Sequence, residues 1–152
     1  MLEAALAEYL LRPATEKDIP FIKGLIHEVR INPTGLDWRR FIVAETISGK
    51  FAGCGQIKPH PDGSLELASI AVVPSERKKG LASKIIRSLL NEASRPIYLT
   101  CRGQLGPFYQ KFGFRIAGED ELPGYFRRIR RLADVVKAFQ IIHDTMLIMI
   151  LE

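Results

Sequence analysis

One stretch near the middle of the chain, Val73–Leu81 (Val-Pro-Ser-Glu-Arg-Lys-Lys-Gly-Leu), constrains the fold most strongly. The apolar run over residues 65–73 predicts a strand that stops at Pro74. A helical pattern follows at once, with apolar residues at spacings of three and four from Ala82 to Leu90. This arrangement, in which a short basic loop with a glycine joins a strand to the start of a helix, is typical of a site that binds a diphosphate. The loop offers backbone N–H groups, and the helix adds its dipole.

The size and charge of the chain limit the classes of protein to consider. Its 152 residues suffice for one domain with its own core, and 47% hydrophobic residues argue against disorder. We therefore predict a single domain over residues 1–152. The formal net charge of +5 allows nucleic acid, an acidic membrane or an anionic small ligand. Part of this charge lies in Arg77–Lys79, where one anionic ligand accounts for it. Without an aromatic-rich RNA-binding signature, we expect no nucleic-acid partner.

The cysteines and the chain's start predict a cytoplasmic protein that has neither a metal nor a membrane partner. Cys54 and Cys101 show no CxxC or Cys/His spacing, which favours buried free thiols. Met1–Leu11 lacks the basic start of a signal peptide. The apolar stretch Ile141–Leu151 is too short to span a bilayer, which takes ~20 residues in a helix.

The apolar periodicity predicts a mixed α/β sheet with helices on both sides. Thr15 caps a first helix, and Asp18 completes a capping box. Short turns join the second, third and fourth strands, which should pair antiparallel. The helix after them links two strands that should lie parallel. Strands are expected at 9–12, 40–46, 51–58, 64–73, 96–101, 114–117 and 145–151, and later helices at 80–94, 105–112 and 122–140.

Two motifs in this order resemble the GCN5-related N-acetyltransferase (GNAT) superfamily. Its acetyl-CoA loop, Gln/Arg-x-x-Gly-x-Gly/Ala, stands here as Arg77-Lys78-Lys79-Gly80-Leu81-Ala82. A second signature, aromatic-Tyr-x-x-x-Gly-Phe, stands as Phe108-Tyr109-Gln110-Lys111-Phe112-Gly113-Phe114. The resemblance extends from Leu10 to Leu151. It implies a GNAT-type domain of mixed α+β class, with a mostly antiparallel sheet whose central parallel pair is splayed at the acetyl-CoA site. It also implies acetyl-CoA as cosubstrate, without a metal.

The resemblance assigns the donor-binding residues. In relatives a bulge splays the strand before the loop, so the backbone groups of Ile70 and Val72 would bind the acetyl and pantetheine parts. Gly80 would let the backbone approach the diphosphate, since it has no Cβ. A solvated basic turn that merely starts a helix is the alternative. The diphosphate would lie against Arg77, Lys78, Lys79, Gly80, Leu81, Ala82 and Ser83.

Two residues are candidates for proton transfer. Tyr109 stands where the family uses a tyrosine to protonate the leaving thiolate. The alternative is a helix tyrosine that packs against Phe112 and Phe114. Glu66 lies eleven residues before Arg77, the spacing of the catalytic glutamate in several histone-acetylating relatives. An outward-facing strand charge is its alternative, and many relatives use a water chain as the base.

Other polar residues fit less specific roles. Arg39 or Arg40 could hold a carboxylate of the acceptor, and Arg102 and Gln104 could touch a ligand at a strand end or form a polar loop. We interpret the three histidines, His27, His60 and His143, as surface or capping residues.

The expected function is acetyl-CoA-dependent transfer of acetyl to an amine, with a small molecule or amino acid as first choice of acceptor. The alternatives are a protein N-terminus or lysine as acceptor, or a non-catalytic CoA-binding sensor. The apolar last strand and the helix before it have two interpretations, which are a homodimer contact and burial within the monomer. The pattern leaves the acceptor, the base, the oligomeric state and the role of the helix at 122–140 open.

Overall fold

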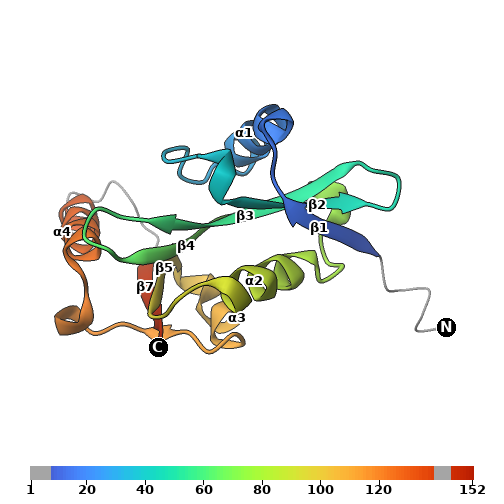
Figure 1. The fold of residues 1–152 in the computed structure, drawn as a ribbon. Helices are drawn as coiled ribbons and strands as arrows, with labels where there is room; N and C mark the ends of the chain where they lie inside the picture. Colours follow the sequence, from blue (N-terminus) through green and yellow to red (C-terminus); the bar gives the residue numbers. More distant parts are fainter. Residues whose placement is uncertain (1–7, 139–144) are drawn as a thin grey trace. The chain divides into compact units, whose positions relative to one another are not determined.

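The computed structural model describes residues 8–138 and 145–152 (Figure 1). Strands and α-helices follow one another in the predicted order, β-α-β-β-β-α-β-α-β-α-β. The strands are β1 (Tyr9–Pro13), β2 (Phe41–Thr46), β3 (Phe51–Pro59), β4 (Leu65–Val72), β5 (Ile97–Arg102), β6 (Arg115–Ile116) and β7 (Met146–Leu151). The helices are α1 (Ile19–Val29), α2 (Leu81–Glu92), α3 (Gly106–Gln110) and α4 (Gly124–Ala138).

The strands follow the order β1-β2-β3-β4-β5-β7-β6 in one sheet. Antiparallel pairing joins β1 to β2, β2 to β3, β5 to β7 and β6 to β7. Parallel pairing joins β4 to β5, with Leu65 opposite Ile97 and Glu66 opposite Tyr98. The prediction of a mixed, mostly antiparallel sheet with one central parallel pair is confirmed.

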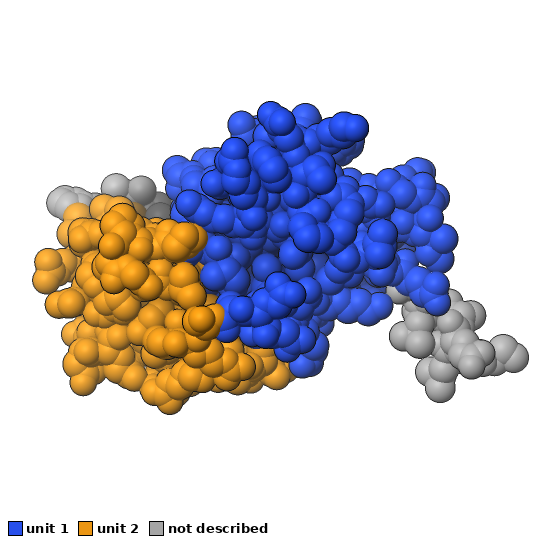
Figure 2. Space-filling view, viewed as in Figure 1, with its two compact units in different colours: residues 1–58, 67–93 blue, residues 59–66, 94–152 orange. Residues whose placement is uncertain are grey.

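The chain divides into two compact units (Figure 2). Unit 1 comprises residues 1–58 and 67–93, and unit 2 comprises residues 59–66 and 94–152. The division falls inside β4, after Glu66. A single domain over residues 1–152 stays a prediction.

In unit 1, helices cover both faces of the strands: α1 lies on one face and α2 on the other (Figure 1). On the α1 face, Ile22 and Ile26 pack with Val43 and Cys54, and all four are buried. On the α2 face, β3 carries glycines because there is no room for a side chain. A Cβ at Gly53 would lie 2.8 Å from the Ala71 carbonyl oxygen, and one at Gly55 would lie 2.6 Å from Ile70 Cδ1.

The predicted capping box is present, but it lies on a 3₁₀ turn before α1, whose own N-cap residue is Asp18. The Thr15 backbone N–H donates to Asp18 Oδ2 at 2.7 Å, and a single 3₁₀ turn (Glu16–Asp18) leads into α1. Arg12 donates to both carboxylate oxygens of Asp18, at 2.7 and 2.8 Å. This bidentate pair fixes the start of α1 against the end of β1.

In unit 2, the first turn of α4 packs against β5 and β7. Phe126 is fully buried and stacks on Tyr98 with ring centroids 5.0 Å apart, among Ala117, Leu122, Ile148 and Ile150. Residues 148–151 of β7 are all buried, as expected for a strand covered on both faces. Several predicted bounds differ from the observed ones by one or two residues. β6 is shorter than the expected 114–117, and α4 begins at Gly124 because Pro123 and a 3₁₀ turn (Glu119–Glu121) precede it. Residues 139 and 140 lie outside the described ranges.

Across residues 8–138 and 145–152, the helices are too short or too polar to cross a membrane.

Candidate active site

The loop before α2 presents backbone N–H groups at an open helix start. Gly80 is the N-cap residue and adopts the left-handed conformation, with φ of 78°. No side chain caps the first turn of α2, and the turn contains no acidic residue. A Cβ at Gly80 would meet nothing within 4 Å, so a ligand can approach the backbone here. Leu81 anchors the loop, since its side chain is 1% exposed.

The basic side chains of this loop are exposed, and two of them are held locally. Arg77 Nε donates to the Val72 carbonyl at 3.2 Å, which ties the loop back to the end of β4. Lys79 Nζ lies 3.2 Å from Glu76 Oε2. Lys78 adopts a left-handed φ of 63°. Exposed cations beside free helix N–H groups form a site that fits a diphosphate. The binding of the donor by the loop residues Arg77 to Ser83 stays a prediction.

The backbone of β4 is irregular at Ser69. This residue has φ of 60°, the left-handed region that non-glycine residues rarely adopt. It directly precedes Ile70, in the segment where the family resemblance implies a bulge. Gln56 on β3 donates from Nε2 to Ser69 Oγ at 2.9 Å, and Cys54 Sγ lies 3.6 Å from the Ser69 carbonyl oxygen. Neither Gln56 nor Ser69 stood out in the sequence, because a serine in an apolar strand carries no mark of a left-handed backbone.

Glu66 is buried and paired with a histidine. Its side chain is 11% exposed, and Glu66 Oε1 lies 2.7 Å from His60 Nε2. The interpretation of Glu66 as an outward-facing charge is therefore wrong. So is the interpretation of His60 as a surface or capping residue, because its side chain is only 5% exposed. The signal available in the sequence was the short turn, which places a histidine at 60 opposite a glutamate at 66.

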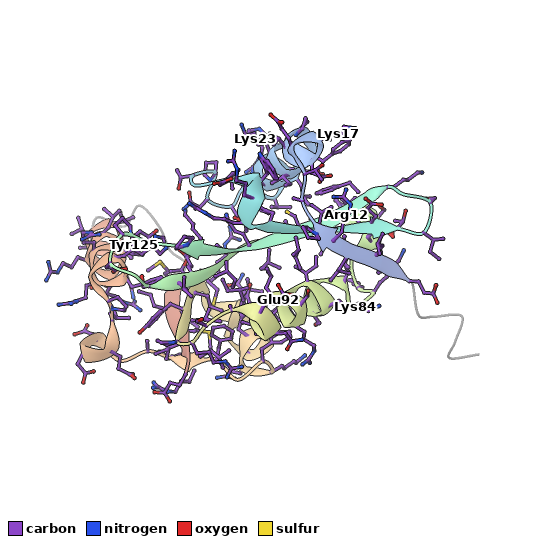
Figure 3. All side chains as sticks on the ribbon, in the orientation of Figure 1. Arg12, Lys17, Lys23, Lys84, Glu92 and Tyr125 are labelled. Atoms are coloured by element: carbon purple, nitrogen blue, oxygen red, sulfur yellow. The ribbon has the colours of Figure 1, made fainter. Side chains whose placement is uncertain are left out.

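Helix α4 covers this pair. The ring of Tyr125, which lies at the start of α4 in Figure 3, stacks on the His60 ring with centroids 3.5 Å apart. Phe126 meets the same ring edge-on at 5.7 Å. We refer to Glu66, His60, Tyr125 and Phe126 as the His60 cluster. The role of this helix was open from the sequence, and the structure shows that it closes the cluster.

Asp62 fixes the start of α4 on the turn between β3 and β4. Its Oδ2 accepts the Tyr125 backbone N–H at 2.9 Å, and its Oδ1 accepts from Ser64 N at 2.9 Å and Ser64 Oγ at 2.6 Å. The Ser64 hydroxyl and then the Tyr125 N–H lower the pKa of Asp62 to about 2. Asp62 is therefore ionised at neutral pH and holds the first turn of α4 in place.

Tyr109 lies on α3 as a protonated phenol. Its ring packs edge-on against Phe108, at a centroid distance of 5.1 Å, and Phe114, at 6.2 Å. Burial, and then the neighbouring Cys101, raise the pKa of Tyr109 to about 12. Among the residues that the structure describes, no hydrogen-bond partner is seen for this phenol. The ring thus packs on Phe114 as the structural interpretation predicts, and on Phe108, while the hydroxyl keeps its proton at neutral pH.

The other polar candidates lie at the surface. Arg39 pairs with Asp37 at 3.2 Å and its guanidinium lies 4.9 Å from the centroid of the Trp38 ring, whereas Arg40 is exposed. Arg102 and Gln104 are exposed as well. Within the described residues, no group of three or more His, Cys, Asp or Glu side chains could hold a metal ion.

The mixed sheet with its central parallel pair and the open start of α2 agree with the resemblance to the acetyltransferases. The family model of the acetyltransferase (GNAT) domain matches residues 37–116, which is just over half of the chain. The chain therefore belongs to the GNAT acetyltransferase family, whose cosubstrate is acetyl-CoA. The resemblance stated from the two motifs is confirmed. None of the curated proteins matches the chain in a sequence comparison.

Solved structures share this fold. The N-acetylglutamate synthase from Neisseria gonorrhoeae, complexed with coenzyme A and N-acetyl-glutamate, aligns with a TM-score of 0.75 at 21% identity. The alignment covers 95% of this chain and 35% of the synthase, so the chain spans about a third of that protein. Rv2747 from Mycobacterium tuberculosis, in complex with CoA, has a TM-score of 0.70 at 22% identity, over 94% and 99% of the two chains. Escherichia coli ElaA has a TM-score of 0.64 at 15% identity, over 96% and 99%.

Proposed function

We propose that this protein transfers the acetyl group of acetyl-CoA to the amine of a small molecule, with an amino acid as the first choice. The observation that carries the donor half is the loop at the start of α2. Gly80 there is left-handed and open, and the helix N–H groups lack a side-chain cap. A diphosphate supplies the negative charge that this helix start favours.

The proposed acceptor class rests on the neighbours that cover nearly the whole chain. The Neisseria synthase is complexed with N-acetyl-glutamate in one structure and with L-arginine in another. By contrast, the alignment with Ard1 from Thermoplasma volcanium covers only 72% of this chain. The exposed Arg40 could pair with the carboxylate of an amino acid, because a guanidinium binds a carboxylate through two parallel hydrogen bonds.

In the proposed reaction, the neutral amine attacks the thioester carbonyl carbon, a C–N bond forms and the C–S bond breaks. The backbone at Ile70 and Val72 binds the acetyl and pantetheine parts, and an N–H there polarises the carbonyl. Tyr109 gives its proton to the leaving sulfur, which becomes the CoA thiol. A phenol with a pKa near 12 carries that proton throughout the neutral range.

The amine must lose a proton, and we propose Glu66 as the group that accepts it. His60 Nε2 holds Glu66 Oε1 at 2.7 Å, which leaves Oε2 to accept from the acceptor, directly or through water. His60 is then a positioning residue for Glu66, and Tyr125 keeps the His60 ring in place by stacking. A base formed by a water chain alone would make the pair dispensable for turnover.

The experiment that tests the acceptor class is a panel assay of CoA thiol release with the full chain. The panel holds free amino acids, amino sugars, polyamines, and peptides with a free N-terminus or an internal lysine. We expect acceptor-dependent release with one group of small amines, and a mass gain of one acetyl group on that amine. Release with the peptides alone would replace the small-molecule proposal by protein N-terminal or lysine acetylation.

A further inference from the structure

Gln56 on β3 is a buried amide that is only half satisfied. It is fully buried, with 0% exposure. Nε2 donates twice, to Ser69 Oγ at 2.9 Å and to the Gly35 carbonyl at 3.2 Å. Its carbonyl oxygen Oε1 is buried and has no hydrogen-bond partner among the described residues. Other residues that face α1 from the same strands, such as Val43 and Cys54, are apolar and belong to the core.

This amide is a poor choice for stability alone. Burying a carbonyl without a partner destabilises the folded state, whereas an apolar side chain of similar size would fill the same space without that penalty. The groups that accept hydrogen bonds from the Gln56 amide N–H therefore indicate the function of this residue. One of them holds Ser69, the residue of β4 that lies in the left-handed region.

The conformation of Ser69 sets the direction of the backbone at Ile70. A serine at φ of 60° is strained, because only glycine adopts this region without steric cost. The Gln56 hydrogen bond to Ser69 Oγ opposes relaxation to an extended strand. Relaxation would turn the Ile70 N–H away from its present direction, because the planar peptide group that joins Ser69 to Ile70 rotates with the backbone angles of Ser69.

We propose that Gln56 is a positioning residue for acetyl transfer. It holds Ser69 in the left-handed conformation and thereby aims the backbone N–H at Ile70 toward the thioester carbonyl of acetyl-CoA. This inference rests on the proposed function, since it assumes that β4 binds the acetyl group. Gln56 acts through the backbone and does not itself touch the substrate.

Lys58, on the same strand, offers a matched control for the second hydrogen bond of Gln56, which is donated to the Gly35 carbonyl. Gly35 belongs to the loop between α1 and β2, and this loop is also held by Lys58, whose Nζ donates to the Thr34 carbonyl at 3.1 Å. Lys58 thus contacts the same loop from the same strand without touching Ser69. A variant at Lys58 reports the effect of loosening the loop, and a variant at Gln56 adds the effect on Ser69.

The test compares CoA and acetyl-CoA binding by calorimetry in the wild-type chain, Gln56→Leu and Lys58→Met, with thermal unfolding of each protein alone. For Gln56→Leu we expect the ratio of the acetyl-CoA to the CoA dissociation constant to rise about three- to tenfold, the worth of one hydrogen bond. The unfolding midpoint should change by less than about 3 °C, because lost hydrogen bonds are offset by removal of the unpartnered carbonyl. Lys58→Met should leave the ratio unchanged.

A rescue variant separates positioning from simple packing. Glycine adopts positive φ freely, so Gln56→Leu combined with Ser69→Gly should restore the wild-type ratio. An unchanged ratio in Gln56→Leu overturns the inference. So does a large fall of the unfolding midpoint with equal weakening of both ligands, or a ratio that Ser69→Gly fails to restore. If the wild-type chain binds neither CoA nor acetyl-CoA, the proposed function itself fails.

Discussion

The loop before α2 exposes its charged and polar groups, whereas the His60 cluster buries them. The loop presents backbone N–H groups and exposed cations to a ligand that brings its own charge. The cluster buries a carboxylate and an imidazole beneath two aromatic rings, where each partner satisfies the other. Tyr109 is a separate buried group, and burial raises its pKa to about 12. The proposed diphosphate site is therefore open to solvent, whereas the groups proposed for proton transfer are enclosed.

This contrast assigns different kinetic roles to the two regions. Changes in the loop should alter the affinity for acetyl-CoA, and changes among the buried groups of unit 2 should alter turnover. The predictions below test that division from the largest expected effect to the smallest.

Replacing Tyr109 by Phe should lower kcat by about 100- to 1,000-fold, because the leaving thiolate loses its proton donor. The Michaelis constant for acetyl-CoA should stay within about twofold, since the phenol acts at the leaving sulfur as it departs. Thiol release in steady state measures both constants. Tyr98→Phe is the matched control, because Tyr98 is also a largely buried tyrosine of unit 2, and its hydroxyl donates to the Glu121 carbonyl at 3.4 Å.

The raised pKa of Tyr109 gives this prediction a pH dependence. The folded value is about 12, above the ordinary value of 10.0, so the phenol keeps its proton as the pH rises to 10. The rate should therefore show no fall from loss of this proton below about pH 10. The same shift makes folding stability decline between pH 10 and 12, where the unfolded tyrosine ionises first, and Tyr109→Phe should flatten that decline. Wild-type activity in Tyr109→Phe would remove the residue from the mechanism.

Replacing Glu66 by Gln should lower kcat by about 100-fold, the lower range for loss of a general base. His60→Leu should have a smaller effect, about tenfold, because it frees the carboxylate without removing it. His60→Gln keeps an N–H donor and should retain more activity than His60→Leu. Full activity in Glu66→Gln would favour a water chain as the base.

The loop can be tested with two glycines in the same conformation. Gly80 and Gly49 have φ of 78° and 84°, and a Cβ at either would meet nothing within 4 Å. Alanine at either position should destabilise the fold by about 1 kcal/mol, the usual penalty of the left-handed region. Gly80→Ala alone should raise the acetyl-CoA dissociation constant, by about tenfold, with kcat for bound substrate nearly unchanged. Equal affinities in the two variants would contradict a diphosphate site at α2.

The smallest effect concerns the start of α4. The folded pKa of Asp62 is about 2, below the ordinary 3.8, so its carboxylate contributes stability above pH 4 that is lost as the pH falls toward 2. Asp62→Asn should remove this acid-side dependence and lower the unfolding midpoint at neutral pH slightly. Thermal unfolding between pH 2 and 7 measures it. An acid-side slope identical to the wild type would show that Asp62 does not hold α4.

The sequence predicted the local structure of the proposed donor loop, but it predicted the surroundings of the proposed proton-transfer groups only in part. Gly80 and the basic residues are neighbours in the chain, so their pattern alone predicts a strand, a loop and a helix start. The His60 cluster joins a turn to Tyr125 on α4, more than sixty residues away, and nothing local marks that pairing. Ser69 escaped prediction for a different reason. Serine does not favour a left-handed backbone, and the contacts that Ser69 makes there, with Gln56 and Cys54, come from another strand.

The most direct test of the central claim is acceptor-dependent release of CoA from bound acetyl-CoA. Calorimetry first establishes that the wild-type chain binds acetyl-CoA, and thiol release is then followed as each amine of the panel is added. We predict release that requires an amine, that saturates with it and that yields one acetylated product per thiol. Tight binding of acetyl-CoA with no amine-dependent release across the panel would contradict the account and identify the chain as a CoA-binding sensor.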